Sequence, residues 1–108
     1  MKHRVVFSPE ALGQLVEIFR YIAEAASPDI AARYTDAIVR YCEGLHTFPL
    51  RGAKRDDVRP GLRITHYKKR TVIAYDVSSE VVSIIGIFYG GQDYETVLRD
   101  MSDIGDVE

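Results

Sequence analysis

The chain has 108 residues, a formal net charge of −2 at pH 7, and 46% hydrophobic residues. These values are those of one ordinary globular domain, and they exclude collagen-like and low-complexity chains and proteins that bind nucleic acid through bulk positive charge. The sequence has no apolar run long enough to cross a bilayer and no signal-peptide pattern, so we expect a soluble, cytoplasmic protein.

The first half of the chain predicts one short strand followed by two helices. Arg4–Phe7 contains good strand formers and is cut off by Ser8-Pro9, a start signal for a helix. Ser27-Pro28 repeats that signal, so the first helix stops near Ala26 and a second helix begins at once. The second helix is predicted to end at Phe48-Pro49. So short a connector predicts an antiparallel helical hairpin.

Each predicted helix has an apolar stripe and a charged stripe. The apolar positions of the first helix recur every three or four residues: Ala11, Leu12, Leu15, Ile18, Phe19, Ile22 and Ala25. Those of the second helix are Ile30, Tyr34, Ala37, Ile38, Tyr41 and Leu45. The acidic stripes are typical of solvated faces, with a recognition surface as the alternative. The single cysteine, Cys42, cannot form an internal disulfide and fits a buried, reduced position.

The second half of the chain predicts a three-stranded region. Its elements are a basic loop at Leu50–Asp57, strands at Leu62–Tyr67, Thr71–Val77 and Val81–Tyr89, and a helical turn at Glu95–Arg99. Val81–Tyr89 is apolar at nearly every position, which favours a central strand covered on both faces or flanked on both edges. The predicted fold is α+β, in the order β-α-α-β-β-β, with the helical hairpin on one face of a small, mainly antiparallel sheet. We expect a single domain over residues 1–99 and an acidic, flexible tail at 100–108.

Five segments also carry a family pattern: Arg4–Ala11, Ile18 with Tyr21–Ala23, Arg59–Arg63, Val72–Tyr75 and Ile87–Tyr94. In this order they resemble the ParE branch of the RelE/ParE toxin superfamily, over nearly the whole chain. The resemblance implies a toxin of a bacterial type II toxin–antitoxin pair, neutralised by a ParD-like antitoxin in a hetero-oligomer. It also implies DNA gyrase as the target, which is the target of characterised ParE proteins.

The residues favour a toxin that binds its target over one that cuts messenger RNA. RNA cleavage needs groups that activate a 2′-hydroxyl, stabilise phosphorane charge and protonate a leaving oxygen. Thr71–Asp93 contains no Lys, Arg or His, which leaves Tyr89 and Tyr94 without an adjacent cation. His66 with Tyr67 and nearby cations is the alternative for a RelE-type mRNA interferase, and an inactive antitoxin-binding module is a third possibility. No metal-ligand spacing or phosphate loop is present, so we expect no cofactor and no metal.

We expect the target contact at the exit of the last strand, at Phe88, Tyr89, Gln92, Asp93 and Tyr94. Aromatic and amide groups on a rigid strand end can bind a protein surface without bond chemistry. The alternative is structural: Phe88 in the core, Tyr89 against a helix, and Gln92-Asp93 in a turn.

The segment Arg51–Arg70 has eight basic and two acidic residues, so it is a candidate docking surface for an acidic partner. A solvated loop and a nucleic-acid patch are the alternatives, and no sequence-specific nucleic-acid binding is expected. We expect Arg59 and Arg63 to meet acidic groups of the antitoxin. A helix of the antitoxin is expected to cover the helical hairpin at Tyr34 and Tyr41.

Overall fold

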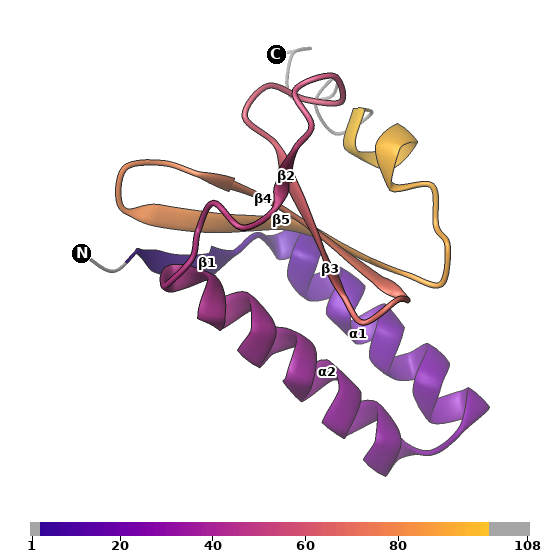
Figure 1. Ribbon diagram of the computed structural model, residues 1–108. Helices are drawn as coiled ribbons and strands as arrows, with labels where there is room; N and C mark the ends of the chain where they lie inside the picture. Colours follow the sequence, from indigo (N-terminus) through magenta and orange to yellow (C-terminus); the bar gives the residue numbers. More distant parts are fainter. Residues whose placement is uncertain (1–2, 100–108) are drawn as a thin grey trace.

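Two long helices lie against one face of a five-stranded sheet, and a short helical segment lies on the other face (Figure 1). The computed structural model describes residues 3–99. The elements are β1 (Arg4–Phe7), α1 (Pro9–Ala25), α2 (Pro28–Glu43), the 3-10 helix η1 (Gly44–His46), β2 (Ala53–Lys54), β3 (Arg63–Tyr67), β4 (Thr71–Val77) and β5 (Val81–Tyr89). Residues 94–99 are helical, and the predicted tail at 100–108 lies outside the described residues. The predicted α+β order is confirmed, and β2 adds a short strand within the predicted loop.

The strand order in the sheet is β1-β5-β4-β3-β2. β1 pairs with β5 in parallel, and every other pair is antiparallel, so the mainly antiparallel sheet is confirmed. β5 has a neighbour on both edges, as predicted, although the middle position belongs to β4. Among residues 3–99, no helix is long and apolar enough to span a membrane.

A bulge in β5 changes which face of the sheet its last side chains point to. The register with β4 shifts between Ala74 and Tyr75, which leaves Ile85 of β5 as an extra residue. Strict alternation would have pointed Phe88 at the helices. Instead, Ile87 packs in the core beneath the helices and Phe88 packs in the core on the other face. The strand therefore contributes to two cores.

These two cores lie on opposite faces of the sheet. The larger one joins the helical hairpin to the sheet and contains Ala11, Ile18, Ile22, Ala31, Ile38, Cys42, Leu45, Ile73, Tyr75, Val82, Ile84 and Ile87. The smaller one lies beneath residues 94–99 and contains Val58, Leu62, Ile64, Ala74, Phe88 and Leu98. Burial of both faces matches the apolar character of β4 and β5.

Both helices begin at the predicted caps. The Ser8 Oγ accepts a hydrogen bond from the Ala11 N–H at 3.0 Å, and the Ser27 Oγ accepts one from the Ile30 N–H at 3.1 Å. α2 ends at Glu43, earlier than predicted, because the chain tightens into η1. The prediction that Ile30 is part of the buried stripe is wrong, since this side chain is 49% exposed. Figure 1 shows the start of α2 projecting away from the sheet.

Cys42 should be unreactive in the folded protein. Burial raises the pKa of its thiol to about 12, so very little thiolate exists at about pH 8. We expect an aromatic disulfide reagent to leave the native protein unmodified and to react fully after unfolding in guanidinium chloride. Rapid reaction of the native protein would contradict the buried position of this thiol.

Candidate functional site

The end of β5 forms one wall of an open hollow beside α1, with a volume of about 450 Å³. The hollow is lined by Gln14, Glu17, Ile18, Tyr21, Arg70, Tyr89, Gly90 and Gln92. Two of the five predicted target-contact residues, Tyr89 and Gln92, therefore line one surface. Three parts of the chain, far apart in sequence, build it.

Backbone hydrogen bonds hold the turn beyond β5 in place. Gly90 and Gly91 have φ values of 72° and 86°, a left-handed region that favours glycine. The Tyr89 N–H donates to the Gln92 Oε1 at 3.0 Å, and the Gly90 N–H donates to the Arg70 carbonyl at 2.9 Å. The turn is thus held by the side chain of Gln92 within it and by the backbone of Arg70, the residue before β4. These hydrogen bonds fix the position of this wall of the hollow.

Both exit tyrosines have a cation beside them. The Arg70 guanidinium lies 5.8 Å from the centroid of the Tyr89 ring, and the Arg55 Nη1 donates to the Tyr94 hydroxyl at 3.1 Å. The sequence-based inference that these tyrosines lack an adjacent cation is therefore wrong. The count along Thr71–Asp93 missed them because both arginines lie before this stretch and reach the tyrosines through the fold.

The other exit residues have structural contacts. Phe88 is only 2% exposed and belongs to the smaller core. Asp93 caps the helical segment 94–99: its Oδ1 accepts from the Thr96 N–H at 3.3 Å, and its Oδ2 accepts from the Thr96 Oγ1 at 2.8 Å. Of the five predicted residues, the structure brings only Tyr89 and Gln92 to the hollow.

The residues predicted to bind the antitoxin are spread over two regions. Tyr34 and Tyr41 are half-buried in α2, and their hydroxyls lie 2.7 Å from the Thr71 Oγ1 and 3.0 Å from the Thr65 Oγ1. Burial raises the pKa of Tyr34. These tyrosines therefore join α2 to the sheet as well as presenting an edge to solvent.

The two predicted arginines lie in the turn before β3 and on β3 itself. Arg59 is half-buried in the turn before β3. Arg63 on β3 donates from Nη1 to the carbonyls of Leu50 at 3.0 Å and Gly52 at 2.7 Å, so it holds the segment that leads into β2. The structure does not group these arginines with the two tyrosines in one contact network.

The residues of the ribonuclease alternative are also separated. His66 is exposed and Tyr67 packs in the larger core, on opposite faces of β3. Their side chains therefore cannot act together on one substrate bond. Within residues 3–99, no group of three or more His, Cys, Asp or Glu side chains could hold a metal ion.

The helical hairpin carries a second open surface on its outer side. A shallow, mainly apolar groove between α1 and α2 is lined by Leu15, Val16, Phe19, Thr35, Asp36 and Val39. Leu12 and Val16 on α1 remain about half exposed. Exposed apolar side chains beside a groove are typical of a protein-binding surface.

A family model described as the ParE toxin of the type II toxin–antitoxin system parDE matches residues 5–94. The chain belongs to this ParE toxin family. It is 32% identical over 87 residues to Toxin ParE3 of Caulobacter vibrioides, a match that covers 81% of this chain and 86% of that protein. ParE-family membership confirms the toxin role that the resemblance implies.

Two solved structures share the fold of this ParE-family toxin. A structure of the chromosomal ParDE TA system from P. aeruginosa matches with a TM-score of 0.73 and 19% identity, covering 82% of this chain and 97% of that chain. The toxin–antitoxin complex RelBE2 from Mycobacterium tuberculosis matches with a TM-score of 0.55 and 19% identity, covering 82% and 99%. At this level of identity the similarity concerns the fold alone.

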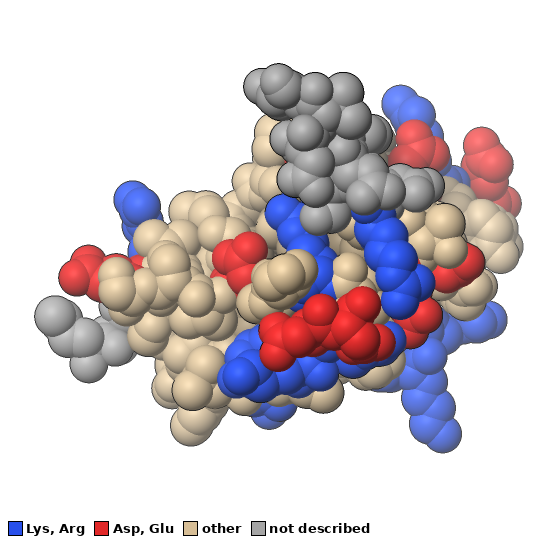
Figure 2. All heavy atoms as spheres, turned by 90° about the horizontal axis from the view of Figure 1, so that it is seen from above, with Lys and Arg blue, Asp and Glu red and all other residues tan. Residues whose placement is uncertain are grey.

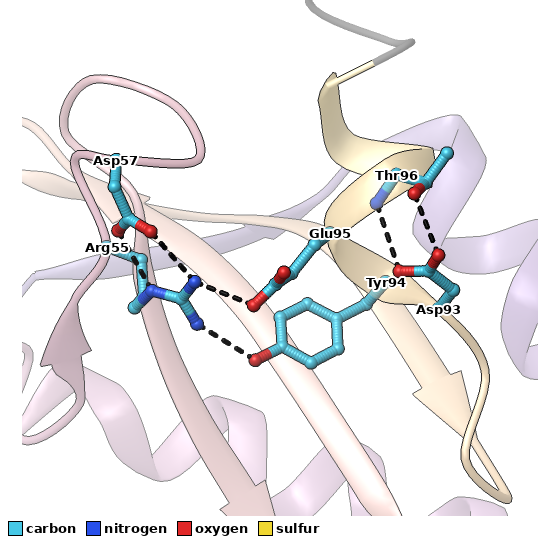
Figure 3. Close-up of polar contacts among 6 residues, drawn as sticks. All are labelled: Arg55, Asp57, Asp93, Tyr94, Glu95 and Thr96. Atoms are coloured by element: carbon cyan, nitrogen blue, oxygen red, sulfur yellow. Dashed lines mark hydrogen bonds and ion pairs between the residues drawn. The ribbon is translucent and has the colours of Figure 1, made fainter.

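In this ParE-family toxin the side chain of Arg55, which no sequence pattern singled out, joins two distant segments (Figure 3). Its Nε and Nη2 donate to the two carboxylate oxygens of Asp57 at 3.0 Å each, and Nη2 also donates to the Glu95 Oε2 at 2.7 Å. These carboxylates raise the pKa of Arg55, and Arg55 in turn lowers the pKa of Asp57. The cluster fastens the loop before β3 to the helical segment 94–99. Only the Arg55-x-Asp57 spacing was visible in the sequence.

The outer face of the sheet therefore carries compensated charge. Seen from above, acidic and basic side chains lie in contact on this face and do not form a patch of one sign (Figure 2). Arg55, although part of the basic segment Arg51–Arg70, is balanced by Asp57 and Glu95. The net positive charge counted along that segment overstates what this face presents to a partner.

Acid should weaken the attachment of the helical segment 94–99. The pKa of Asp57 is lowered by its hydrogen bonds to Arg55, and that of Asp93 by its hydrogen bonds to Thr96. A carboxyl group with a lower pKa in the folded state adds stability above its unfolded pKa, about 4, and this stability is lost as the pH falls through the folded pKa. Denaturant titrations should therefore show stability falling below about pH 5. The Asp57→Asn/Asp93→Asn double variant should lose part of this pH dependence, and identical pH profiles would contradict the assignment.

Proposed function

We propose that this chain is a toxin that inhibits DNA gyrase by binding to it, and that a ParD-like antitoxin neutralises it in a hetero-oligomer. ParE-family membership supports the toxin role. The structural neighbour from P. aeruginosa carries the name of a ParDE system, which supports a ParD-like partner. Gyrase as the target is supported by the resemblance to characterised ParE proteins. The observation that carries the proposal is the hollow at the end of β5.

The groups in this hollow suit contact better than bond cleavage. Tyr21 is 62% exposed, and its ring packs against that of Tyr89, with the two ring centroids 5.8 Å apart. Glu17 and Arg70 are its charged groups, and no histidine is among its lining residues. Arginine stays protonated at neutral pH and cannot relay a proton. An exposed aromatic beside a cation is instead typical of a protein-binding hot spot.

The groove between α1 and α2 is the proposed main docking site of the antitoxin. Its exposed apolar side chains, with Leu12 and Val16 at its border, suit the apolar side of a partner helix. Tyr34 and Tyr41, together with Arg59 and Arg63, remain proposed contacts. Arg63 already uses one guanidinium nitrogen for two backbone carbonyls, so we assign Arg59 the larger share of any ion pairing.

The Tyr21→Ala variant tests the proposed target contact. We expect it to weaken growth inhibition, and gyrase inhibition in a supercoiling and cleavage assay, by about tenfold or more, because exposed aromatic residues often dominate interface energies. The variant should still co-purify with the antitoxin. Glu24→Ala, an exposed change one turn further along α1 and outside the hollow, is the matched control and should remain toxic.

Two outcomes would contradict the proposal, one for the target and one for the contact surface. If the unchanged protein leaves gyrase unaffected, the target is wrong. If Tyr21→Ala remains as potent as Glu24→Ala, the hollow is not the contact.

One observation favours a second candidate, a ribosome-dependent mRNA interferase. Arg70 and Tyr89 lie together in the hollow, where a guanidinium could stabilise charge at a phosphate, and Glu17 adds a carboxylate that could accept a proton. Adding the purified chain to translating ribosomes and mapping transcript ends tests this candidate. Codon-linked cuts that disappear in an Arg70→Gln variant would establish it, and intact transcripts would exclude it. Inactivity in both assays would indicate an inactive antitoxin-binding module.

A further inference from the structure

Five tyrosines form a continuous row along the seam between the helices and the sheet. In spatial order they are Tyr21, Tyr89, Tyr34, Tyr67 and Tyr41. Neighbouring ring centroids lie 5.8, 5.6, 5.8 and 5.4 Å apart, with interplanar angles between 55° and 73°. The rings come from α1, β5, α2 and β3, so the fold assembles the row from four elements.

Three exposed cations stand over this row. The Arg51 guanidinium lies 5.4 Å from the Tyr41 centroid, the Lys68 Nζ lies 5.8 Å from the Tyr67 centroid, and Arg70 covers Tyr89. Among the ion pairs of the described residues, none involves Arg51, Lys68 or Arg70. The row therefore presents three positive charges that the described part of the chain leaves uncompensated.

Open surface borders the row at both ends. At one end, Tyr21 and Tyr89 line the hollow beyond β5. At the other end, Arg51 belongs to a shallow depression with Phe48 and Leu50, both 64% exposed. The row therefore has three cations along it, exposed apolar side chains at the Phe48 end, and at the Tyr21 end an aromatic hollow that also contains Glu17.

The arrangement of the rings favours a peptide over a nucleic acid. Single-stranded nucleic acids bind by stacking bases on open aromatic faces. Here each ring meets its neighbours at a steep angle, and cations cover three of the rings. The hydroxyls of Tyr34 and Tyr41 are already bonded to the sheet. The three cations and the exposed apolar side chains of Phe48 and Leu50 remain available, and these suit an extended peptide that carries acidic residues beside apolar ones.

We propose that this tyrosine–cation row binds an extended acidic segment of the antitoxin, and that one end of the segment fills the hollow at Tyr21 and Tyr89. This inference rests on the proposed antitoxin partner and names a site on the toxin that the groove between α1 and α2 does not include. Neutralisation then has a direct cause, because the antitoxin segment occupies the surface proposed to contact the target.

The test replaces the three cations and leaves the tyrosines intact. The triple variant is Arg51→Gln, Lys68→Gln and Arg70→Gln. Isothermal titration with a ParD-like antitoxin that binds the unchanged protein should show affinity weakened by about tenfold or more at low salt, with a smaller difference at high salt, since salt screens exposed charge pairs. The three cations are exposed, so the thermal unfolding midpoint should stay close to that of the unchanged protein.

A matched control removes the same amount of charge elsewhere. The control triple variant is Arg4→Gln, Lys54→Gln and Lys69→Gln, all exposed residues with no ring beneath them. Lys69 lies between Lys68 and Arg70 in the same turn. Its replacement therefore distinguishes the effect of a cation that lies over a tyrosine ring from the effect of positive charge in this turn. The control should bind within about twofold of the unchanged protein.

Three outcomes would overturn the inference. Equal affinity of the two triple variants would remove the site and leave the antitoxin partnership standing. Absence of binding by the unchanged protein would remove the partnership and the site together. Binding of a single-stranded oligonucleotide that only the first triple variant loses would show that the row is a nucleic-acid surface.

Discussion

Replacing Gly86 by alanine should lower the free energy of unfolding by about 2–3 kcal/mol, although the change adds one methyl group. A Cβ at this position would lie 2.6 Å from the Cε2 and 2.8 Å from the Cζ of Phe88. The Phe88 ring cannot withdraw easily, because it is buried in the smaller core with Leu98. The midpoint of thermal unfolding should fall by roughly 10 °C.

The same substitution at Gly13 is the control for this experiment. Gly13 lies within α1, and beyond its own stretch of helix an added Cβ would meet no described atom within 4 Å. Alanine is favoured over glycine in a helix by about 0.5–1 kcal/mol, so Gly13→Ala should stabilise the protein. The two midpoints should therefore move in opposite directions. A neutral result for Gly86→Ala would mean that the ring of Phe88 has room to shift.

The Ile38→Ala variant should be destabilised by about 3–4 kcal/mol, which is a large part of the stability of a domain this size. Ile38 is 0% exposed and lies in the larger core, where α2 packs above the sheet. Removing its side chain takes away buried apolar surface and leaves a cavity that the surrounding residues fill only in part. Denaturant unfolding followed by circular dichroism measures the loss.

Ile30 provides the internal comparison on the same helix. It was assigned to the same apolar stripe as Ile38, yet half of its side chain is exposed. Ile30→Ala should change the stability by no more than about 0.5 kcal/mol. Similar losses for both variants would contradict the packing of α2 described above.

The parts of the fold that were predictable depend on local signals. Ser8 and Ser27 mark the helix starts through hydrogen bonds that span only three residues, so the sequence alone identifies them. The helical hairpin and the three main strands follow from the periodicity of apolar residues. The bulge at Ile85 leaves no comparable signal, because the residue before it and the residue after it are also apolar or small.

The candidate site was harder to predict because its residues meet only in the folded chain. Tyr89 and Gln92 were identified from their place after an apolar strand, and both line the hollow. Their neighbour Tyr21 lies on α1, and no spacing in the sequence links it to β5. Arg70 was counted only as part of a basic segment, and the absence of cations within Thr71–Asp93 was given too much weight. Proximity across a sheet and a helix does not appear in such a count.

The pairing of the first strand, β1, with the last strand, β5, affects how the toxin folds during synthesis. β1 is the first strand to be synthesised, yet its partner is the last: Arg4 pairs with Val81 and Phe7 pairs with Ile84. A growing chain therefore carries both helices and β4 while β1 still has no partner. Tyr89 and Gln92 emerge from the ribosome later still. A chain that stops before β5 thus lacks both a closed sheet and the proposed contact surface, so an active toxin requires translation through at least Gln92.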